Sequence, residues 1–232
     1  MALRSLLRGF RAGFPQRFAP TRTRGGDSGP GLAPTEDWQW DLAFETCAGF
    51  RNPLTRRHAR ALLLLCRAAG LDGGDVRFVT GGDVERRAGA GLWVVVRRRA
   101  AQRAVPVLAR YADRLEDLAV DRPARCLVAG VPAPCQSDTA STLAGLVNRQ
   151  LRRAGHDFTV SAARMRKAWL IEHVAANVPV NTLCRAAGLV SLRSIERLVI
   201  DHGPQPPGDD ECTARALGGI APRRRTSRNR PE

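Results

Sequence analysis

The stretch that decides the fold runs from Phe158 to Leu198 and reads FTVSAARMRKAWLIEHVAANVPVNTLCRAAGLVSLRSIERL. Within it, Met165, Trp169 and His173 follow one another at intervals of four residues, which is the spacing of one helix face. Gly188 then interrupts the helical pattern before a second run of apolar residues. The stretch therefore predicts three successive helices, over residues 161–176, 179–187 and 191–200. Met165, Trp169 and His173 are expected in the core.

Toward the N-terminus lies a strongly apolar run, TRRHARALLLLCRAA, at residues 55–69. It predicts a buried helix that Thr55 can cap at its start and Gly70 ends. Two further helices are expected over residues 111–118 and 141–154, where apolar residues again recur with helical spacing.

A short β element is predicted between these helices. The segments LWVVV (92–96) and AVPVL (104–108) are rich in β-branched residues and flank the basic segment RRRAAQR. Pro106 lacks a backbone N–H, so the second strand should lie at a sheet edge. The fold class that follows is mainly α with a small antiparallel β-sheet (α+β).

Composition divides the chain into three parts. Residues 1–36 combine arginine with a Gly/Pro/Ser/Thr-rich run and predict a disordered basic arm and linker, for which an organellar targeting peptide is the alternative. Residues 203–232 predict a disordered Pro/Arg-rich tail, because they hold few apolar residues. One folded domain is expected over residues 37–202.

The chain is strongly basic, with a formal net charge of +15, most of it within residues 37–202. Such a domain favours a polyanionic partner such as duplex DNA. Lys167 is the only lysine among 37 basic residues, which indicates a GC-rich, actinobacterial-like genome. The six cysteines show no metal-ligand spacing, and no apolar run reaches the length of a membrane span. We therefore expect a cytoplasmic protein with reduced cysteines, no metal, no cofactor and no membrane partner.

Together the C-terminal stretch, the hairpin ending Arg-x-Val-Pro at 103–106 and the segment AGLDGGD at 69–75 resemble the catalytic domain of the tyrosine recombinases (phage integrases). The resemblance covers about residues 54–200. It implies duplex DNA as partner and cleavage through a phosphotyrosine link. In that reaction two arginines neutralise the phosphate while histidine and lysine residues move protons.

Most of the family's catalytic positions are replaced in this chain. Arg166 matches the second phosphate-binding arginine, but Asp72 stands at the position of the first. Ala163 and Leu189 occupy histidine positions, and Leu198 occupies that of the nucleophilic tyrosine. The resemblance therefore implies a catalytically inactive, degenerate member in which Arg166 is a surviving phosphate contact.

The same resemblance and the local charge predict a set of DNA-binding side chains. In the hairpin, arginine can hold a phosphate but cannot act as a general acid, because its pKa lies above 12. Asp75 stands in for a supporting glutamate. The predicted DNA-binding residues are Arg97, Arg98, Arg99, Arg103, Arg164 and Lys167.

Two other functions compete with this interpretation. Residues 183–198 have the small residues and turn glycine of a helix-turn-helix transcriptional regulator, although the spacing from Gly188 to Ile195 is one residue too long. The third possibility is a non-functional remnant or an accessory chain that pairs with itself or with an intact recombinase. Only about 50 residues precede the first strong helix, so the second DNA-gripping domain of the family is expected to be missing.

Overall fold

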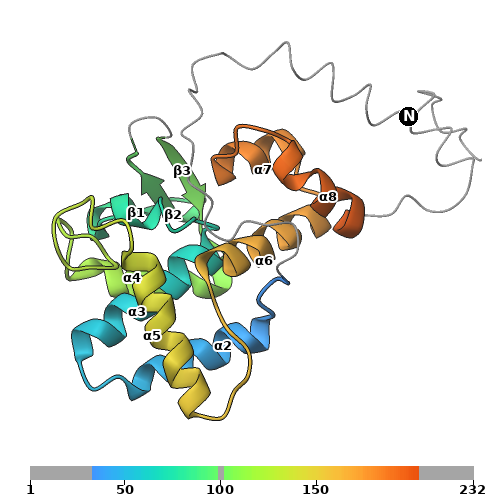
Figure 1. Cartoon of the computed structure of the whole chain (residues 1–232). Helices are drawn as coiled ribbons and strands as arrows, with labels where there is room; N and C mark the ends of the chain where they lie inside the picture. The colour runs from blue at the N-terminus through green and yellow to red at the C-terminus, as the bar shows by residue number, and fades with distance from the viewer. Residues whose placement is uncertain (1–32, 99–101, 204–232) are drawn as a thin grey trace, which may run out of the picture.

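A computed structural model describes residues 33–98 and 102–203 of the chain. These residues form a mainly α-helical fold with a small antiparallel sheet, as predicted (Figure 1). The predicted tail, most of the predicted N-terminal arm and Arg99 lie outside the described residues. The helices are α2 (Asp37–Thr46), α3 (Pro53–Ala68), α4 (Ala109–Val120), α5 (Thr139–Arg153), α6 (Ala162–Ala175), α7 (Val180–Ala187) and α8 (Arg193–His202). The strands are β1 (Val84–Arg87), β2 (Gly91–Val96) and β3 (Arg103–Pro106), and short 3-10 turns are η2 (Cys47–Gly49), η3 (Val76–Phe78) and η4 (Gly81–Asp83).

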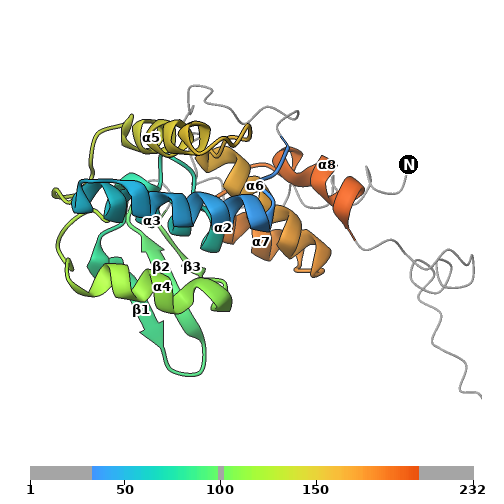
Figure 2. The same ribbon diagram turned by 90° about the horizontal axis from the view of Figure 1, so that it is seen from below.

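Helix α3 is the centre of the fold. Its apolar run is almost wholly buried, and it packs against α4, α5 and α6. Figure 2 shows α2 and α3 as a middle layer, with α5 on one side and α4 and the sheet on the other. The predicted cap was wrong: the side chain of Asn52, and not Thr55, accepts hydrogen bonds from the backbone N–H groups of Leu54 and Thr55. Pro53 therefore starts the helix, where its missing N–H costs nothing.

The sheet has the order β1-β2-β3, with both pairs antiparallel. The sequence predicted β2 and β3, and β3 lies at an edge as Pro106 requires. Strand β1 was missed, because its sequence VERR carries three charged residues. Alternate residues of β2 are buried, and α4 covers this sheet.

The last three helices follow the predicted pattern closely. Ser161 caps α6 by accepting a hydrogen bond from the backbone N–H of Arg164, and Met165 and Trp169 are fully buried. His173 is only half-buried, so the prediction that it lies in the core was wrong. Gly188 ends α7 in the left-handed conformation (φ 66°). Helix α8 packs on α6, whereas α7 packs on β3 and α6. Nothing in this arrangement favours the helix-turn-helix alternative.

An ion network around the buried Arg67 joins four helices near the start of α2. The Arg67 side chain is 4% exposed and donates to Asp37 at 2.5 Å and to Glu172 at 2.8 Å. Arg110 on α4 donates to both carboxylate oxygens of Glu172. Because the network connects α2, α3, α4 and α6, it holds α6 in place relative to the central helix.

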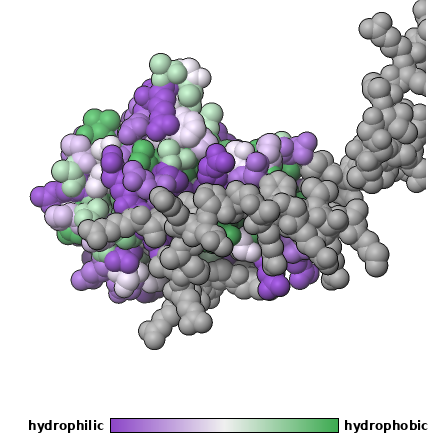
Figure 3. Space-filling model, turned by 90° about the horizontal axis from the view of Figure 1, so that it is seen from above, coloured by the Kyte–Doolittle hydropathy of each residue, from purple (hydrophilic) through white to green (hydrophobic). Residues whose placement is uncertain are grey.

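The surface of the described part is mixed in character. Figure 3 shows hydrophobic residues in small separate patches between hydrophilic ones on the face that it presents. No helix among the described residues is both long and apolar enough to cross a membrane.

Candidate functional site

Arg166 lies where the ends of two helices meet the middle of a third. From α6 its guanidinium donates to the Gly70 carbonyl oxygen, just past α3, at 2.6 Å. It also donates to the carbonyl oxygen of Ala187, the last residue of α7, at 2.5 Å. Carbonyls at a helix C-terminus lack partners within the helix and carry partial negative charge. Arg166 therefore closes the ends of α3 and α7 and ties both to α6.

Asp75 is the buried carboxylate of the site, with an exposed fraction of 2%. One of its oxygens pairs with Arg103 at 2.5 Å, and the other lies 3.5 Å from Arg98. The Arg103 side chain is itself only 7% exposed and donates through Nε to the Ala186 carbonyl oxygen at 2.8 Å. Asp75 thus joins the two hairpin strands, through their arginines, to the turn after α3.

Asp72 forms the turn that presents Asp75. Its Oδ1 accepts from the backbone N–H of Asp75 at 2.8 Å, and its carbonyl oxygen accepts from the N–H groups of Asp75 and Val76. The Asp72 side chain is half-buried. Asp72 therefore has a structural role, because its carboxylate stabilises a tight turn. It also puts a negative charge where the resemblance to the recombinases predicts a phosphate-binding arginine.

The electrostatics of this site are nearly balanced. Burial lowers the pKa of Arg166, while the nearby carboxylates of Asp72 and Asp75 raise it. The same surroundings affect the adjacent thiol, because burial raises the pKa of Cys66. The site combines three guanidinium groups with the carboxylates of Asp72 and Asp75. The two negative charges therefore offset two of the three positive charges.

Two glycines allow the close approach that this arrangement needs. Gly188 has a φ of 66°, and a Cβ on it would lie 2.7 Å from the Arg103 guanidinium carbon. Gly70 has a φ of 60°, and a Cβ there would lie 2.3 Å from the Trp169 ring. Only glycine combines the left-handed conformation with this contact at no steric cost.

The other residues predicted to bind DNA also have partners within the chain. Arg97 pairs with the buried Asp83 at 2.5 Å, which raises the pKa of Arg97. Arg164 donates to the carbonyl oxygens of Ala33 and Thr159. Lys167 is half-buried on α6 and also has an interaction. Arg99 falls outside the described residues, so four of the predicted arginines, Arg97, Arg98, Arg103 and Arg164, are engaged internally.

Of the other positions expected to have lost catalytic side chains, Leu198 and Leu189 pack in or against the hydrophobic core. Leu198, on α8, is 8% exposed and belongs to the core. Ala163 and Leu189 are half-buried. No group of three or more potential metal ligands occurs among the described residues.

Sequence reasoning missed the role of backbone carbonyls in this site. It placed Arg166 at a phosphate-binding position and Arg103 among the DNA-binding residues. Arg166 donates instead to the carbonyls of Gly70 and Ala187, and Arg103 to the Ala186 carbonyl and the Asp75 carboxylate. Gly188 indicated that such carbonyls exist, because a glycine after a helix often marks a helix end whose last carbonyls have no partner within the helix. Nothing local in the sequence shows which side chain reaches them.

Comparison with known proteins identifies the fold. No protein-family model matches the sequence, and no curated protein is similar to it. The crystal structure of XerA recombinase is similar with a TM-score of 0.55 and 12% identity, covering 96% of this chain and 75% of that one. XerH site-specific recombinase bound to palindromic difH substrate, a post-cleavage complex, gives a TM-score of 0.55 and 14% identity, covering 80% of this chain and 52% of that one. The chain thus spans about half the length of XerH.

A third similar structure is the Tn1549 transposon integrase in complex with circular intermediate DNA. Its TM-score is 0.52 at 12% identity, and the match covers 94% of this chain and 78% of that one. At these identities the likeness concerns the fold alone. The chain has the fold of tyrosine recombinase catalytic domains, as its sequence predicted.

Proposed function

We propose that this chain is an integrase-like DNA-binding protein that does not cleave DNA. The observation that carries the proposal is that the arginines of the candidate site bind groups of the protein itself. In a fold otherwise like that of site-specific recombinases, Arg166 is held by two carbonyls, and Arg98 and Arg103 both pair with the single carboxylate of Asp75. The groups that would bind a scissile phosphate in this fold are used to hold the protein together.

Binding to DNA is supported by the fold and by the net charge. The solved structures similar to this chain include recombinases and integrases in complex with DNA. The chain carries a formal net charge of +15, which favours a polyanion through release of condensed counterions. Duplex DNA is therefore the partner that best fits both properties.

Loss of cleavage follows from the chemistry of the replaced positions. A phosphotyrosine link needs a nucleophilic hydroxyl, and the family's nucleophile position carries a core leucine, Leu198. Transition-state stabilisation needs donors aimed at the phosphate oxygens. The donors of Arg166 point at protein carbonyls instead, and Asp72 and Asp75 would repel an approaching phosphate.

Two measurements with the full chain test this proposal. Fluorescence anisotropy with a labelled duplex of about 20 base pairs should show binding that weakens steeply between about 50 and 200 mM salt. A nicked suicide duplex, run on a denaturing gel, should show no covalent adduct, whereas an active tyrosine recombinase on its own nicked site gives one. Absence of DNA binding at low salt would refute the binding claim, and a covalent adduct would refute the inactive one.

A further inference from the structure

A group of exposed arginines lies at one end of α5. Arg149, Arg152 and Arg153 occupy positions i, i+3 and i+4 of this helix, so they share one face. All three are exposed, and so is Arg51, which lies just before α3. We name the four residues together the α5 basic end.

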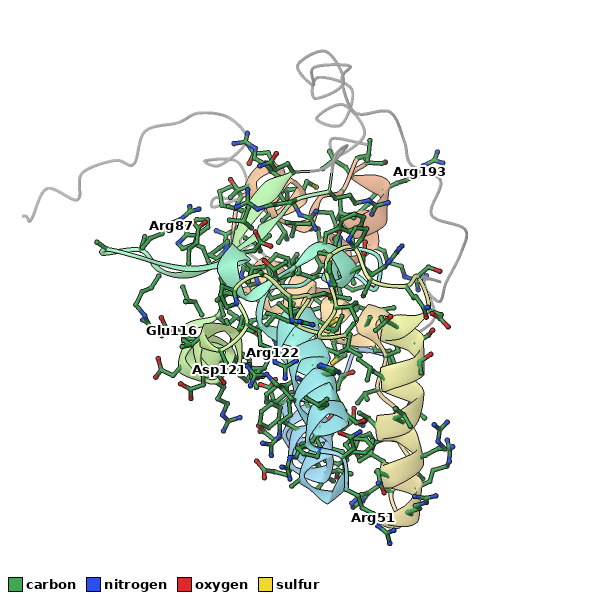
Figure 4. All side chains as sticks on the ribbon, turned by 90° about the vertical axis from the view of Figure 1, so that its left-hand side faces the viewer. Arg51, Arg87, Glu116, Asp121, Arg122 and Arg193 are labelled. Carbon is green, nitrogen blue, oxygen red and sulfur yellow. The ribbon has the colours of Figure 1, made fainter. Side chains whose placement is uncertain are left out.

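The topology brings these four residues to the same end of the molecule. Helix α5 starts beside the turn after α3, where a Cβ on Gly73 would lie 3.3 Å from the Ala140 methyl group. It packs along α3 and also contacts η2, which lies at the other end of α3, next to Arg51. The two helices are therefore antiparallel, and Figure 4 shows Arg51 beside the lower end of α5.

The arginines of the α5 basic end have no carboxylate partner among the described residues. Within residues 33–98 and 102–203, no carboxylate lies within 4.0 Å of a guanidinium nitrogen of these four arginines. Elsewhere, ten arginines form ion pairs, including Arg97, Arg98 and Arg103 of the candidate site. Arg125, Arg185 and Arg193 are also exposed without such a pair, but they lie singly in the sequence, whereas the α5 basic end gathers four arginines in one place.

The spacing of the group fits a phosphate backbone. Arg149 and Arg153 are separated by about 6 Å along the helix axis. Along one strand of duplex DNA, phosphates recur about every 3.4 Å of helix axis, so Arg149 and Arg153 are separated by about two phosphate intervals. Arginine also binds phosphate with two parallel N–H groups, which an exposed guanidinium without a carboxylate partner can supply.

We propose that the α5 basic end contacts the phosphate backbone of duplex DNA and is a DNA-binding surface separate from the Arg166 site. The proposal rests on the DNA-binding function proposed above and assigns it a location. The Arg166 site lies near the first turn of α5, where Gly73 meets Ala140, and the α5 basic end lies at the last turn. Phosphates bound at the α5 basic end would not reach the Arg166 site.

A structural explanation accounts for only part of this group. Arg152 and Arg153 lie in the last turn of α5, where positive charge complements the helix dipole. Arg149 lies one turn earlier, and Arg51 belongs to another segment, so the dipole does not explain why they are here. A role limited to the dipole predicts an effect on stability without an effect on DNA binding.

The test compares two triple variants of the full chain that remove the same amount of charge. The first is Arg149→Gln, Arg152→Gln and Arg153→Gln. The control is Arg86→Gln, Arg87→Gln and Arg114→Gln, which removes exposed arginines that already pair with carboxylates. Binding to a labelled duplex is measured by anisotropy across a salt series, and circular dichroism checks that both variants fold.

The α5 variant should lower the slope of log K against log salt by up to about 2.7, which is about 0.9 for each phosphate that the three arginines neutralise in the wild-type complex. The control variant should change the slope by less than about 0.9, which is the value for one neutralised phosphate. Equal changes in both variants would show that only net charge matters and would overturn the proposal. Wild-type slope and affinity in the α5 variant would overturn it too. Failure of the wild-type chain to bind DNA would instead refute the proposed function.

A second measurement needs no variant. Phenylglyoxal modifies exposed arginines, and mass spectrometry identifies each modified peptide. Bound duplex should protect Arg149, Arg152 and Arg153 more than Arg86 and Arg114 in the wild-type chain. Equal modification of Arg149, Arg152 and Arg153 with and without DNA, under conditions where anisotropy shows saturation, would overturn the proposal even if the triple variant does not fold.

Discussion

The carboxylate of Asp75 pairs with the guanidinium of Arg103 at 2.5 Å, and the two side chains are only 3% and 7% exposed. A buried pair of this kind gains little over a hydrophobic pair, but removing one partner leaves an uncompensated buried charge. The two residues are 28 positions apart in the chain. The pair therefore holds the edge strand β3 to the turn after α3, and it removes Arg103 from any role toward DNA.

Asp75→Asn should destabilise the protein by about 3–5 kcal/mol, because Arg103 would remain charged and buried. Urea denaturation followed by circular dichroism measures this change. Asp113→Asn is the control, since its pair with Arg86 is exposed and contributes little to stability. Equal unfolding free energies for the two variants would show that the Asp75 pair is not a structural element.

Arg166→Met should reduce stability and leave DNA binding nearly unchanged. It removes two charge-assisted hydrogen bonds, each worth about 1.5–3 kcal/mol, to the carbonyls of Gly70 and Ala187. Urea denaturation and anisotropy on the same preparation separate the two effects. A loss of DNA affinity without a loss of stability would restore Arg166 as a phosphate contact.

Gly70→Ala and Gly89→Ala form a matched pair, because both glycines have a positive φ (60° and 70°). Alanine in this conformation costs about 1–2 kcal/mol at either position. At Gly70 the added Cβ also meets the Trp169 ring, whereas at Gly89 nothing lies within 4 Å. The Gly70 variant should therefore lose about 1–3 kcal/mol more in a urea melt. Equal losses would mean that Trp169 can move aside.

The ion network around Glu172 should make stability sensitive to acid. Burial alone would raise the pKa of Glu172, but hydrogen bonds from Arg110 and Arg67 outweigh it and lower the pKa to about 2. A lowered pKa in the folded state stabilises the protein above the ordinary value of 4.5, and this contribution is lost as the pH falls from about 5 toward 2. It amounts to at most about 3 kcal/mol.

Glu172→Gln tests this prediction, since glutamine keeps the shape of the side chain and cannot titrate. The variant should be less stable than the wild type at neutral pH, and the difference should shrink between about pH 5 and pH 2. Thermal melts at several pH values measure it, with Glu45→Gln at an exposed position as a control. A difference that stays constant over this range would assign the acid sensitivity to other groups.

The helices could be predicted from sequence because their signals are local and strong. The leucine run of α3 and the four-residue spacing of Met165 and Trp169 place apolar side chains on a buried face in any mainly helical fold. Strand β1 could not be predicted in this way. It is four residues long, three of them are charged, and Arg86 extends across to Glu116 on α4. Its stability comes from the tertiary contact.

The interactions within the candidate site could not be predicted from the sequence. The resemblance to the recombinases named Asp72, Arg98 and Arg166, which lie in one neighbourhood with Asp75 in the structure, but their role toward DNA stays a prediction. What Arg166 binds depends on carbonyls that are 96 and 21 residues away in the chain. Local patterns carry no information about such contacts, so an arginine that holds the fold and one that binds phosphate look alike in the sequence.

Leu198→Tyr asks whether the missing nucleophile alone explains the proposed inactivity. The variant should form no covalent adduct with a nicked suicide duplex, because a hydroxyl without phosphate-binding donors gains no transition-state stabilisation. A tyrosine at this core position also adds a polar group where Leu198 is 8% exposed, so folding is checked by circular dichroism. Leu198→Phe is the matched control for size. An adduct with the Leu198→Tyr variant but not with the Leu198→Phe variant would show that Arg166 can leave the carbonyls of Gly70 and Ala187 for a phosphate. The inactivity would then depend on the nucleophile alone, and the neutralised arginines would be a resting state of the site.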